Sequence, residues 1–379
     1  MARTIRYGLV GTGMMGVEHL RNLAITPGAM VTAIADPVAQ SLAWARDALA
    51  QTPGARAAHV AECADAASLA ASGLVDAVVV ASPNHTHRTV LPPLLDAGLH
   101  ILCEKPLATT VADAYWIANR AARHPAVFWV AMEYRYMPPA AEFIRQVHEG
   151  RVGALRMLTL REHRFPFLVK VGDWNRFAAN TGGTMVEKCC HFFDLMRLIV
   201  RSEPVRVHCS GAMDVNHVDE RYDGRQPDIL DHAYAVVDFE SGPRALLELC
   251  MFAEGSRYQE EISIVGPKGK VECFVPGPGR FWPAHLGAAP VPRLVLSPRQ
   301  PAGPVDLEVP VDPAALAAGD HNGSTLEQHR RFRHAVLGAG PVEVTLDDGL
   351  AAVIMGLAAQ ESARTGQAID LRSGDYALA

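Results

Sequence analysis

The stretch GLVGTGMMG, residues 8–16, decides the fold of this chain. An apolar run that begins at Ile5 is typical of a strand, and Gly11, Gly13 and Gly16 follow it at G-x-G-x-x-G spacing. Gly11 permits a tight turn, Gly13 lets the backbone approach a pyrophosphate, and Gly16 allows a helix to pack closely on the strand. The start of that helix offers unpaired N–H groups to phosphates. The same residues also suit an ordinary tight loop, so the glycine pattern alone is weak evidence.

An acidic residue strengthens the phosphate-binding interpretation. A second apolar strand ends at Asp36, twenty residues beyond Gly16. A carboxylate at that place accepts hydrogen bonds from both ribose hydroxyls of NAD and repels the 2′-phosphate of NADP. We therefore predict NAD as the cofactor, with Met14 and Met15 of the turn as further contacts. The alternative is a plain glycine turn with a solvated aspartate.

The rest of the chain divides into two parts with different patterns of strands and helices. In the first third, short apolar strands alternate with helical segments, which is typical of a parallel sheet with right-handed crossovers. We predict a Rossmann dinucleotide-binding domain over residues 1–130. From about residue 150 the strands are longer and two-faced, with hairpin turns between them. We predict an α+β domain over residues 131–379 with an open, mainly antiparallel sheet, and a surface excursion in the Pro/Gly/Ala-rich segment 275–305.

Bulk properties exclude several classes of protein. The chain has 379 residues and a net charge of −6, with no basic block that would indicate a nucleic-acid site. Since no apolar run is long enough to span a membrane and the N-terminus leads directly into a strand, we expect neither a membrane segment nor a signal peptide. Seven cysteines without paired metal-ligand spacing favour reduced thiols and a cytoplasmic location.

Polar residues follow two of the expected parallel strands. Glu104 and Lys105 come directly after the strand that ends in ILC, and a proline follows them. Loops at the carboxyl ends of such strands line the ligand crevice, so Lys105 is well placed for proton transfer. The alternative is an ordinary surface lysine. After the strand in VDAVVVASP we expect three further residues near the nicotinamide end of the cofactor, namely Ser82, Asn84 and His87.

A polar stripe lies on an expected helix over residues 184–200. Glu187, His191 and Asp194 are spaced i, i+4 and i+7, on one helix face. A carboxylate one turn from a histidine can orient the ring and raise its pKa, so we predict Glu187 and His191 as catalytic residues. The alternative is a core-packed helix with a hydrogen-bonded histidine. We expect no metal site, because adjacent helix positions such as Cys189 and Cys190 point about 100° apart.

At these motifs the chain resembles the Gfo/Idh/MocA oxidoreductases. The resemblance covers nearly the whole chain and rests on GLVGTGMMG, ASPNHTHRTV, AGLHILCEKPLA, YRYMPPA, EGRVGALR, GGTMVEKCCHFFDLM, IVGPKGKVE and the C-terminal VTLDDGLAAVIMGLAAQESARTGQAIDL. It implies a Rossmann domain, a nicotinamide cofactor and hydride transfer at a carbinol carbon of a sugar or cyclitol, with Lys105 and His191 as counterparts of the family's lysine and histidine. Glu187 stands where the family usually has aspartate, and Cys189 where it usually has glycine.

The resemblance also places the segment LREHRFPFLVKVGDWNRFAANTGG beside the substrate. Trp174 offers a flat apolar face to a sugar ring. The abundance of cationic side chains suggests a negatively charged substrate. The alternative is that these cations form salt bridges on a sheet face or at a subunit interface. The predicted substrate-binding residues are Arg161, His163, Lys170, Trp174, Asn175, Arg176 and the more distant His321.

Three functions fit the residues described above. The first is an NAD-dependent dehydrogenase of a sugar, sugar derivative or inositol, in which Lys105 and His191 share the proton transfer. The second is an NAD-requiring glycosidase that oxidises a ring carbon transiently, eliminates the aglycone and reduces the ketone again, with an anionic glycoside as a candidate substrate. The third is a non-enzymatic NAD-binding regulator, against which Lys105, Glu187 and His191 argue. Because an open sheet face is costly to expose, we expect a homodimer or homotetramer.

Overall fold

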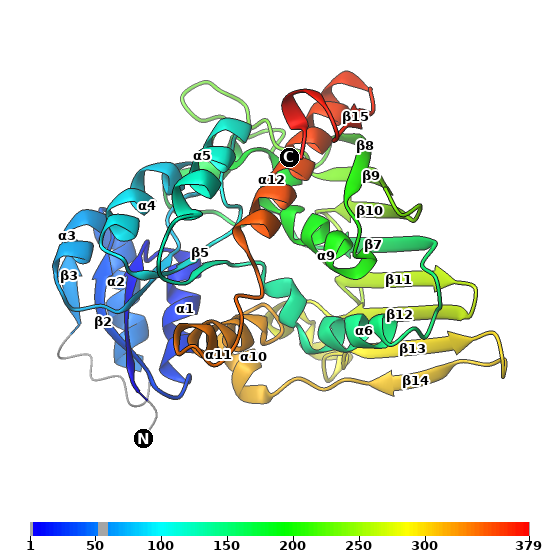
Figure 1. Ribbon diagram of the computed structural model, residues 1–379, viewed down its shortest axis with the longest axis horizontal. Helices are drawn as coiled ribbons and strands as arrows, with labels where there is room; N and C mark the ends of the chain where they lie inside the picture. Colours follow the sequence, from blue (N-terminus) through cyan, green and yellow to red (C-terminus); the bar gives the residue numbers. More distant parts are fainter. Residues whose placement is uncertain (1–2, 52–59, 379) are drawn as a thin grey trace.

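The computed structural model describes residues 3–51 and 60–378. Two sheets lie side by side with helices between them (Figure 1). The first sheet has six strands in the order β3-β2-β1-β4-β5-β6, and the second has nine in the order β14-β13-β12-β11-β7-β10-β9-β8-β15. No helix in this part of the chain is long and apolar enough to cross a membrane.

All strands of the first sheet run parallel. The strands are β1 (Ile5–Val10), β2 (Ala29–Ala35), β3 (Ala61–Cys63), β4 (Ala77–Val80), β5 (His100–Cys103) and β6 (Phe128–Val130). The connecting helices are α1 (Met14–Ala24), α2 (Ala39–Gln51), α3 (Ala66–Ala71), α4 (His87–Asp96) and α5 (Val111–Ala121). The strand order reverses between β1 and β4, where a crevice for ligands opens at the carboxyl ends of the strands. The predicted Rossmann fold is confirmed.

The second sheet is antiparallel except for the parallel pair β7 and β10. Its strands are β7 (Met157–His163), β8 (Pro204–Ala212), β9 (His232–Phe239), β10 (Arg244–Cys250), β11 (Glu260–Gly266), β12 (Gly269–Val275), β13 (Arg293–Pro298), β14 (Val305–Glu308) and β15 (Ile369–Asp370). Strands such as β7 alternate buried and partly exposed residues, as expected for a sheet with one covered face. The predicted mainly antiparallel sheet is confirmed.

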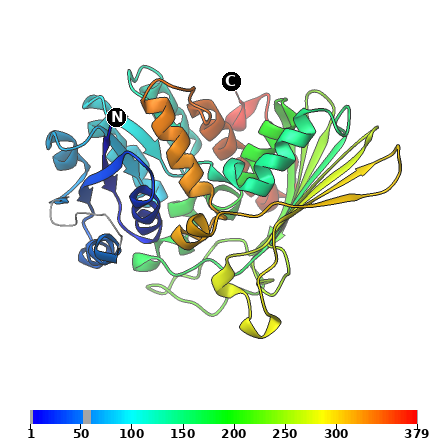
Figure 2. The same ribbon diagram turned by 90° about the horizontal axis from the view of Figure 1, so that it is seen from below.

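Helices cover one face of this sheet and leave the other open (Figure 2). The helices of this half are α6 (Pro138–His148), α7 (Ala178–Thr181), α8 (Thr184–Glu187), α9 (Cys190–Val200), α10 (Pro313–Ala318), α11 (Ser324–Val336) and α12 (Leu346–Thr365). Helix α12 packs on β8 and α9 and also on α5 of the first half, so it joins the two sheets. On the open face Met157 is 63% exposed and Tyr234 is 55% exposed.

The segment 275–305 is not only a surface excursion. Two short 3₁₀ turns, Gly279–Phe281 and Ala284–Leu286, lie at the surface, but β13 pairs along β12 within the sheet. Pairing with β12 explains the difference, and Leu294 of β13 is fully buried despite the Pro- and Gly-rich sequence around it. The prediction from composition that this segment is a surface excursion was therefore wrong for β13.

Candidate active site

A cavity of about 420 Å³ lies at the carboxyl ends of β1, β2, β4 and β5. This volume is within the range of small-molecule and cofactor sites. Residues 169–171 and Trp174, from the loop after β7, form the opposite wall. Of the residues predicted to bind the cofactor, the following line it: Gly11, Gly13, Met14, Met15, Asp36, Ser82, Asn84, Glu104 and Lys105.

The glycine turn has the shape that a pyrophosphate requires. Gly11 has φ +92°, and a Cβ on it would lie 2.5 Å from backbone atoms of Ala81 and Ser82. A Cβ on Gly16 would lie 2.3 Å from the Gly11 carbonyl oxygen, so Gly16 permits the close packing of α1. A Cβ on Gly13 would meet no atom within 4 Å. Gly13 therefore faces the open cavity next to the N-terminus of α1, where anions bind.

The Asp36 carboxylate is held at the edge of the cavity by two backbone donors. It accepts hydrogen bonds from the N–H of Thr12 at 2.7 Å and from the N–H of Val38 at 2.8 Å. These bonds fix the side chain beside the glycine turn, in the position from which an acidic residue contacts the ribose of a bound dinucleotide. The residues present thus suit NAD.

Lys105 lines the cavity together with Glu187. Its Nζ donates a hydrogen bond to the carbonyl oxygen of Glu187 at 3.1 Å. Burial alone would lower the pKa of Lys105, but the charges of Glu187, Glu133 and Glu104 raise it above its ordinary value. Lys105 is therefore an ammonium ion that can donate a hydrogen bond to a substrate oxygen and stabilise negative charge there.

Glu187 does not orient His191, contrary to the prediction from helical spacing. Its carboxylate accepts hydrogen bonds from Asn84 and, at 3.1 Å, from Lys170. The predicted helix is interrupted, since α8 ends at Glu187 and α9 begins at Cys190. The turn between them removes the i, i+4 relation on which the prediction depended.

His191 is buried next to a different carboxylate. Its ring stacks on Tyr134 with a centroid distance of 4.0 Å and an interplanar angle of 5°. The Nε2 atom lies 3.6 Å from Oε1 of Glu133. Burial and the charges of Lys105 and Lys188 hold the pKa of His191 well below its ordinary value. The neutral ring is a proton acceptor, complementary to the cationic Lys105.

Two predicted cofactor residues lie behind the cavity wall. The His87 ring is fully buried, with Nδ1 3.3 Å from the Leu107 carbonyl oxygen and Nε2 3.2 Å from the Ser82 carbonyl oxygen. It supports the loop that carries Ser82. Gly16 permits the close packing of α1 on the glycine turn and does not line the cavity.

Of the predicted substrate residues, Lys170 and Trp174 line the cavity, and the Lys170 ammonium lies 4.5 Å from the centre of the Trp174 ring. Asn175 and Arg176 are buried in the loop behind them, where Asn175 donates to the Leu168 carbonyl oxygen and Arg176 pairs with Glu220.

The structure does not bring Arg161 and His163 to the cavity. Both lie on the open face of the nine-stranded sheet, where they pair with Glu248 of β10, and Arg161 also with Glu261 of β11. The alternation along β7 put them on one face as predicted, but it is the face away from the helices. Salt bridges, the alternative weighed for this segment, account for these cations.

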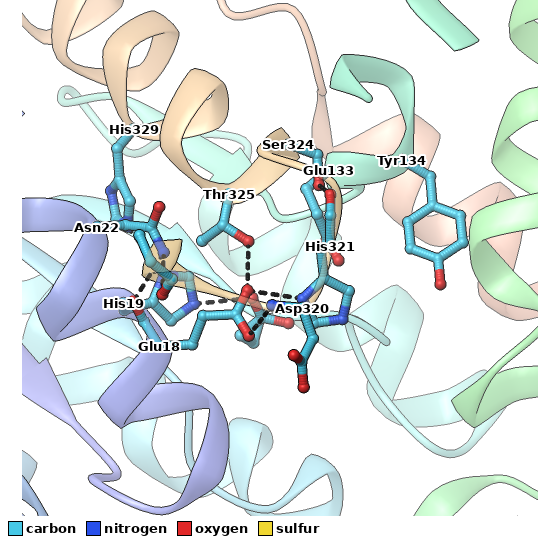
Figure 3. Close-up of polar contacts among 12 residues, drawn as sticks. Glu18, His19, Asn22, Glu133, Tyr134, Asp320, His321, Ser324, Thr325 and His329 are labelled. Carbon is cyan, nitrogen blue, oxygen red and sulfur yellow. Dashed lines mark hydrogen bonds and ion pairs between the residues drawn. The ribbon is translucent and has the colours of Figure 1, made fainter. Parts of the chain in front are cut away.

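His321 connects the two halves of the chain (Figure 3). Its Nδ1 donates to Glu18 of α1 at 2.6 Å, and Thr325 of α11 donates to the same carboxylate at 2.8 Å. Next to this pair, His19 of α1 bridges His329 and Glu104 with 2.9 Å contacts on both sides. Helices α1 and α11 are thereby held together behind the lysine loop.

The ion pair between His321 and Glu18 should make the free energy of unfolding depend on pH. Burial would lower the pKa of His321, but Glu18 raises it to about 9. Burial would raise the pKa of Glu18, but His321 and its hydrogen bonds lower it to about 2. The stabilisation that comes from protonated His321 is fully present below the ordinary pKa of histidine and is lost as pH rises through about 9. The stabilisation that comes from ionised Glu18 is fully present above the ordinary pKa of glutamate and is lost as pH falls through about 2.

We expect His321→Gln to lower the free energy of unfolding by on the order of 2–3 kcal/mol at pH 6 and by much less at pH 10. Thermal unfolding of both proteins across this pH range measures the difference. A melting-temperature difference that stays constant from pH 6 to 10 would contradict the charged pair.

A glycine turn shaped for a pyrophosphate and a half-buried cationic lysine line one cavity at the carboxyl ends of parallel strands, which is typical of a nicotinamide-dependent oxidoreductase. The chain belongs to the Gfo/Idh/MocA oxidoreductase family. Residues 5–132 match the family model described as "Oxidoreductase family, NAD-binding Rossmann fold". Residues 144–371 match the one described as "Oxidoreductase family, C-terminal alpha/beta domain".

Several similar proteins have the names of dehydrogenases. Inositol 2-dehydrogenase 2 of Saccharopolyspora erythraea is 30% identical over 276 residues, which are 72% of this chain and 74% of the relative. Levoglucosan dehydrogenase of Pseudarthrobacter phenanthrenivorans is 24% identical over 397 residues, covering 97% and 98%. Scyllo-inositol dehydrogenase from Lactobacillus casei, solved with NAD(H) and scyllo-inositol, aligns with a TM-score of 0.74 at 21% identity, covering 98% of this chain and 100% of that one.

Proposed function

We propose that the protein oxidises a secondary alcohol of a cyclitol or sugar with NAD. The observation that carries the proposal is that Lys105 lines the same cavity as the glycine turn and Asp36. Bound there, NAD supplies a nicotinamide ring that accepts a hydride from the carbinol carbon. The protein supplies the remaining functions, which are positioning, charge stabilisation and proton transfer.

Lys105 and His191 take different roles in the proposed reaction. Lys105, as an ammonium ion, donates a hydrogen bond to the reacting oxygen and stabilises the negative charge that develops as its proton leaves. His191, as a neutral ring, accepts that proton. Glu187 fixes Asn84 and Lys170 at the cavity wall and presents its backbone carbonyl to Lys105. Its longer side chain, relative to the aspartate usual in the family, thus serves to reach across the cavity.

The substrate is best described as a neutral polyol. Cations of the loop after β7 have carboxylate partners, since Lys170 pairs with Glu187 and Arg176 with Glu220. Arg164 lies 3.7 Å from Glu162. These pairs remove the main reason for expecting an anionic substrate. Trp174 and Lys170 on the cavity wall are the proposed contacts to the ring and its hydroxyls.

We also propose a homodimer or homotetramer formed through the open sheet face, supported by the exposed Met157 and Tyr234. A reducing, cytoplasmic location is supported by the seven cysteines, all of which are unpaired.

The test follows NADH formation while inositols, free sugars, anhydrosugars and synthetic glycosides are each mixed with the protein and NAD. Aglycone release from the glycosides is measured in parallel. We expect steady NADH formation with at least one free polyol. Aglycone release without accumulation of NADH would instead establish the redox-neutral glycosidase, which the dehydrogenase names of the relatives do not favour.

A further inference from the structure

Trp44 of α2 is an exposed tryptophan that lines the cavity of the glycine turn. It is 40% exposed, although tryptophan has one of the largest apolar surfaces that a side chain can bury. Three other tryptophans have partners: Trp116 lies against Arg88, Trp129 against Tyr136 and Phe332, and Trp174 against Lys170 and His85. Within residues 3–51 and 60–378, no aromatic ring or cation lies against Trp44. Its ring is therefore open to a ligand in the cavity.

The direction of α2 aims Trp44 at the Asp36 side of the cavity. Helix α2 begins at Ala39, just after the loop that follows Asp36. Helical side chains lean toward the N-terminus of their helix, so Trp44 covers the turn that holds Ser41. Ser41 and Val38 line the same cavity. The indole ring of Trp44 thus lies beside the residues that follow Asp36.

The order of the strands separates the two halves of a bound dinucleotide. The glycine turn that suits the pyrophosphate follows β1, which lies between β2 and β4. Asp36 after β2 suits the adenosine ribose, whereas Lys105 after β5 lies on the other side of β1. The base that the adenosine ribose carries therefore lies toward β2 and β3, which Figure 1 shows next to α2. Trp44 and residues 64–66, which follow β3, line the cavity there.

The Ser41 hydroxyl is a second sign of a ligand on this side of the cavity. Ser41 lines the cavity and is only 3% exposed. Its hydroxyl forms no hydrogen bond with any residue that the structure describes. Buried polar groups are nearly always paired, because an unpaired one forfeits its hydration. A hydroxyl that both donates and accepts is suited to the polar atoms of a nucleoside.

We propose that Trp44 stacks on the adenine ring of NAD and that the Ser41 hydroxyl forms a hydrogen bond with the adenosine half of the cofactor. The proposal rests on the binding of NAD and not on the proposed oxidation. A base and an indole ring each present a flat π face, and an offset stack of the two removes apolar surface of both from water. Loss of an aromatic side chain under a base lowers affinity about 5- to 150-fold.

The test measures the binding of ADP-ribose to the full-length protein by calorimetry. ADP-ribose has the adenine, both riboses and the pyrophosphate but no nicotinamide. We expect Trp44→Ala to raise the Kd of ADP-ribose about 5- to 50-fold and the Kd of NADH by the same factor. Trp44→Phe keeps an aromatic face and should bind both within about threefold of the wild type. Ser41→Ala should raise both constants about 3- to 10-fold, the effect of one hydrogen bond.

Trp174→Ala is the matched control for Trp44→Ala. Trp174 lines the same cavity from the opposite wall, where it lies against His85 in the turn after β4. Its loss should leave the Kd of ADP-ribose within about twofold. Tryptophan fluorescence gives a second readout, because adenine that stacks on Trp44 should quench its emission. The quench on addition of ADP-ribose should be lost in Trp44→Phe, which still binds the ligand, and retained in Trp174→Phe.

Three outcomes would overturn the role of Trp44. They are binding of ADP-ribose by Trp44→Ala within about twofold of the wild type, an equal loss of affinity in Trp174→Ala, and a quench that persists in Trp44→Phe. None of these measurements requires turnover. If no polyol yields NADH, the proposed oxidation fails, and the titrations still decide whether Trp44 holds the adenine ring.

Discussion

Replacing Lys105 with methionine is expected to lower kcat for polyol oxidation about 10²- to 10⁴-fold, the range for loss of a residue that acts directly on the proton or charge of the transition state. Methionine keeps an unbranched side chain of similar length, so it fills the space that the lysine occupies in the cavity wall. It removes the hydrogen bond to the Glu187 carbonyl oxygen and the positive charge that the neighbouring carboxylates maintain. The Kd of NADH, measured by fluorescence titration, should change less than about fivefold.

Lys170→Met is the matched control for this prediction. Lys170 also pairs with Glu187 and also lines the cavity, but it comes from the loop after β7 and lies against Trp174. Its replacement should raise KM for the polyol more than it lowers kcat, because its contact is made with the bound substrate rather than with the reacting oxygen. Equal losses of kcat in the two variants would show that Lys105 has no special place at the reacting atom.

Much of the fold follows from local signals in the sequence. The run from Ile5 to Gly16 predicts a strand, a turn and the start of a helix within a dozen residues. Uninterrupted valines at residues 78–80 predict a strand that is buried on both faces, and these valines are buried. Alternation in β7 and β10 likewise predicts strands with one covered face. Composition failed at β13, because pairing with β12 outweighs the turn-forming residues nearby.

The site was harder to predict because its contacts are long-range. Helical spacing paired Glu187 with His191, but Glu187 is bound by Asn84, which is 103 residues earlier in the chain. Alternation correctly put Arg161 and His163 on one face of β7 without indicating which face the helices cover. Glu133 was missed, although it follows β6 at the same sheet edge as Lys105, and the rule that directed attention to Lys105 applies to it equally.

The second large effect concerns the choice of cofactor. Replacing Asp36 with alanine is expected to raise the Kd of NADH about 100-fold, since two charge-assisted hydrogen bonds to the ribose are lost at roughly 1.5 kcal/mol or more each. The Kd of NADPH should rise far less or fall, because the variant also removes the repulsion between the carboxylate and the 2′-phosphate. Fluorescence titration with both cofactors measures the two constants on the same protein.

Comparing the two cofactors separates recognition from structural damage. Asp36 also accepts hydrogen bonds from the backbone of Thr12 and Val38, so its loss could loosen the glycine turn. A loosened turn would weaken the binding of the pyrophosphate, which NADH and NADPH share, and would raise both Kd values by the same factor. Loss of ribose recognition changes their ratio instead. Asp36→Asn, which keeps one acceptor oxygen for the turn, should shift that ratio in the same direction, and an unchanged ratio in both variants would remove Asp36 from cofactor selection.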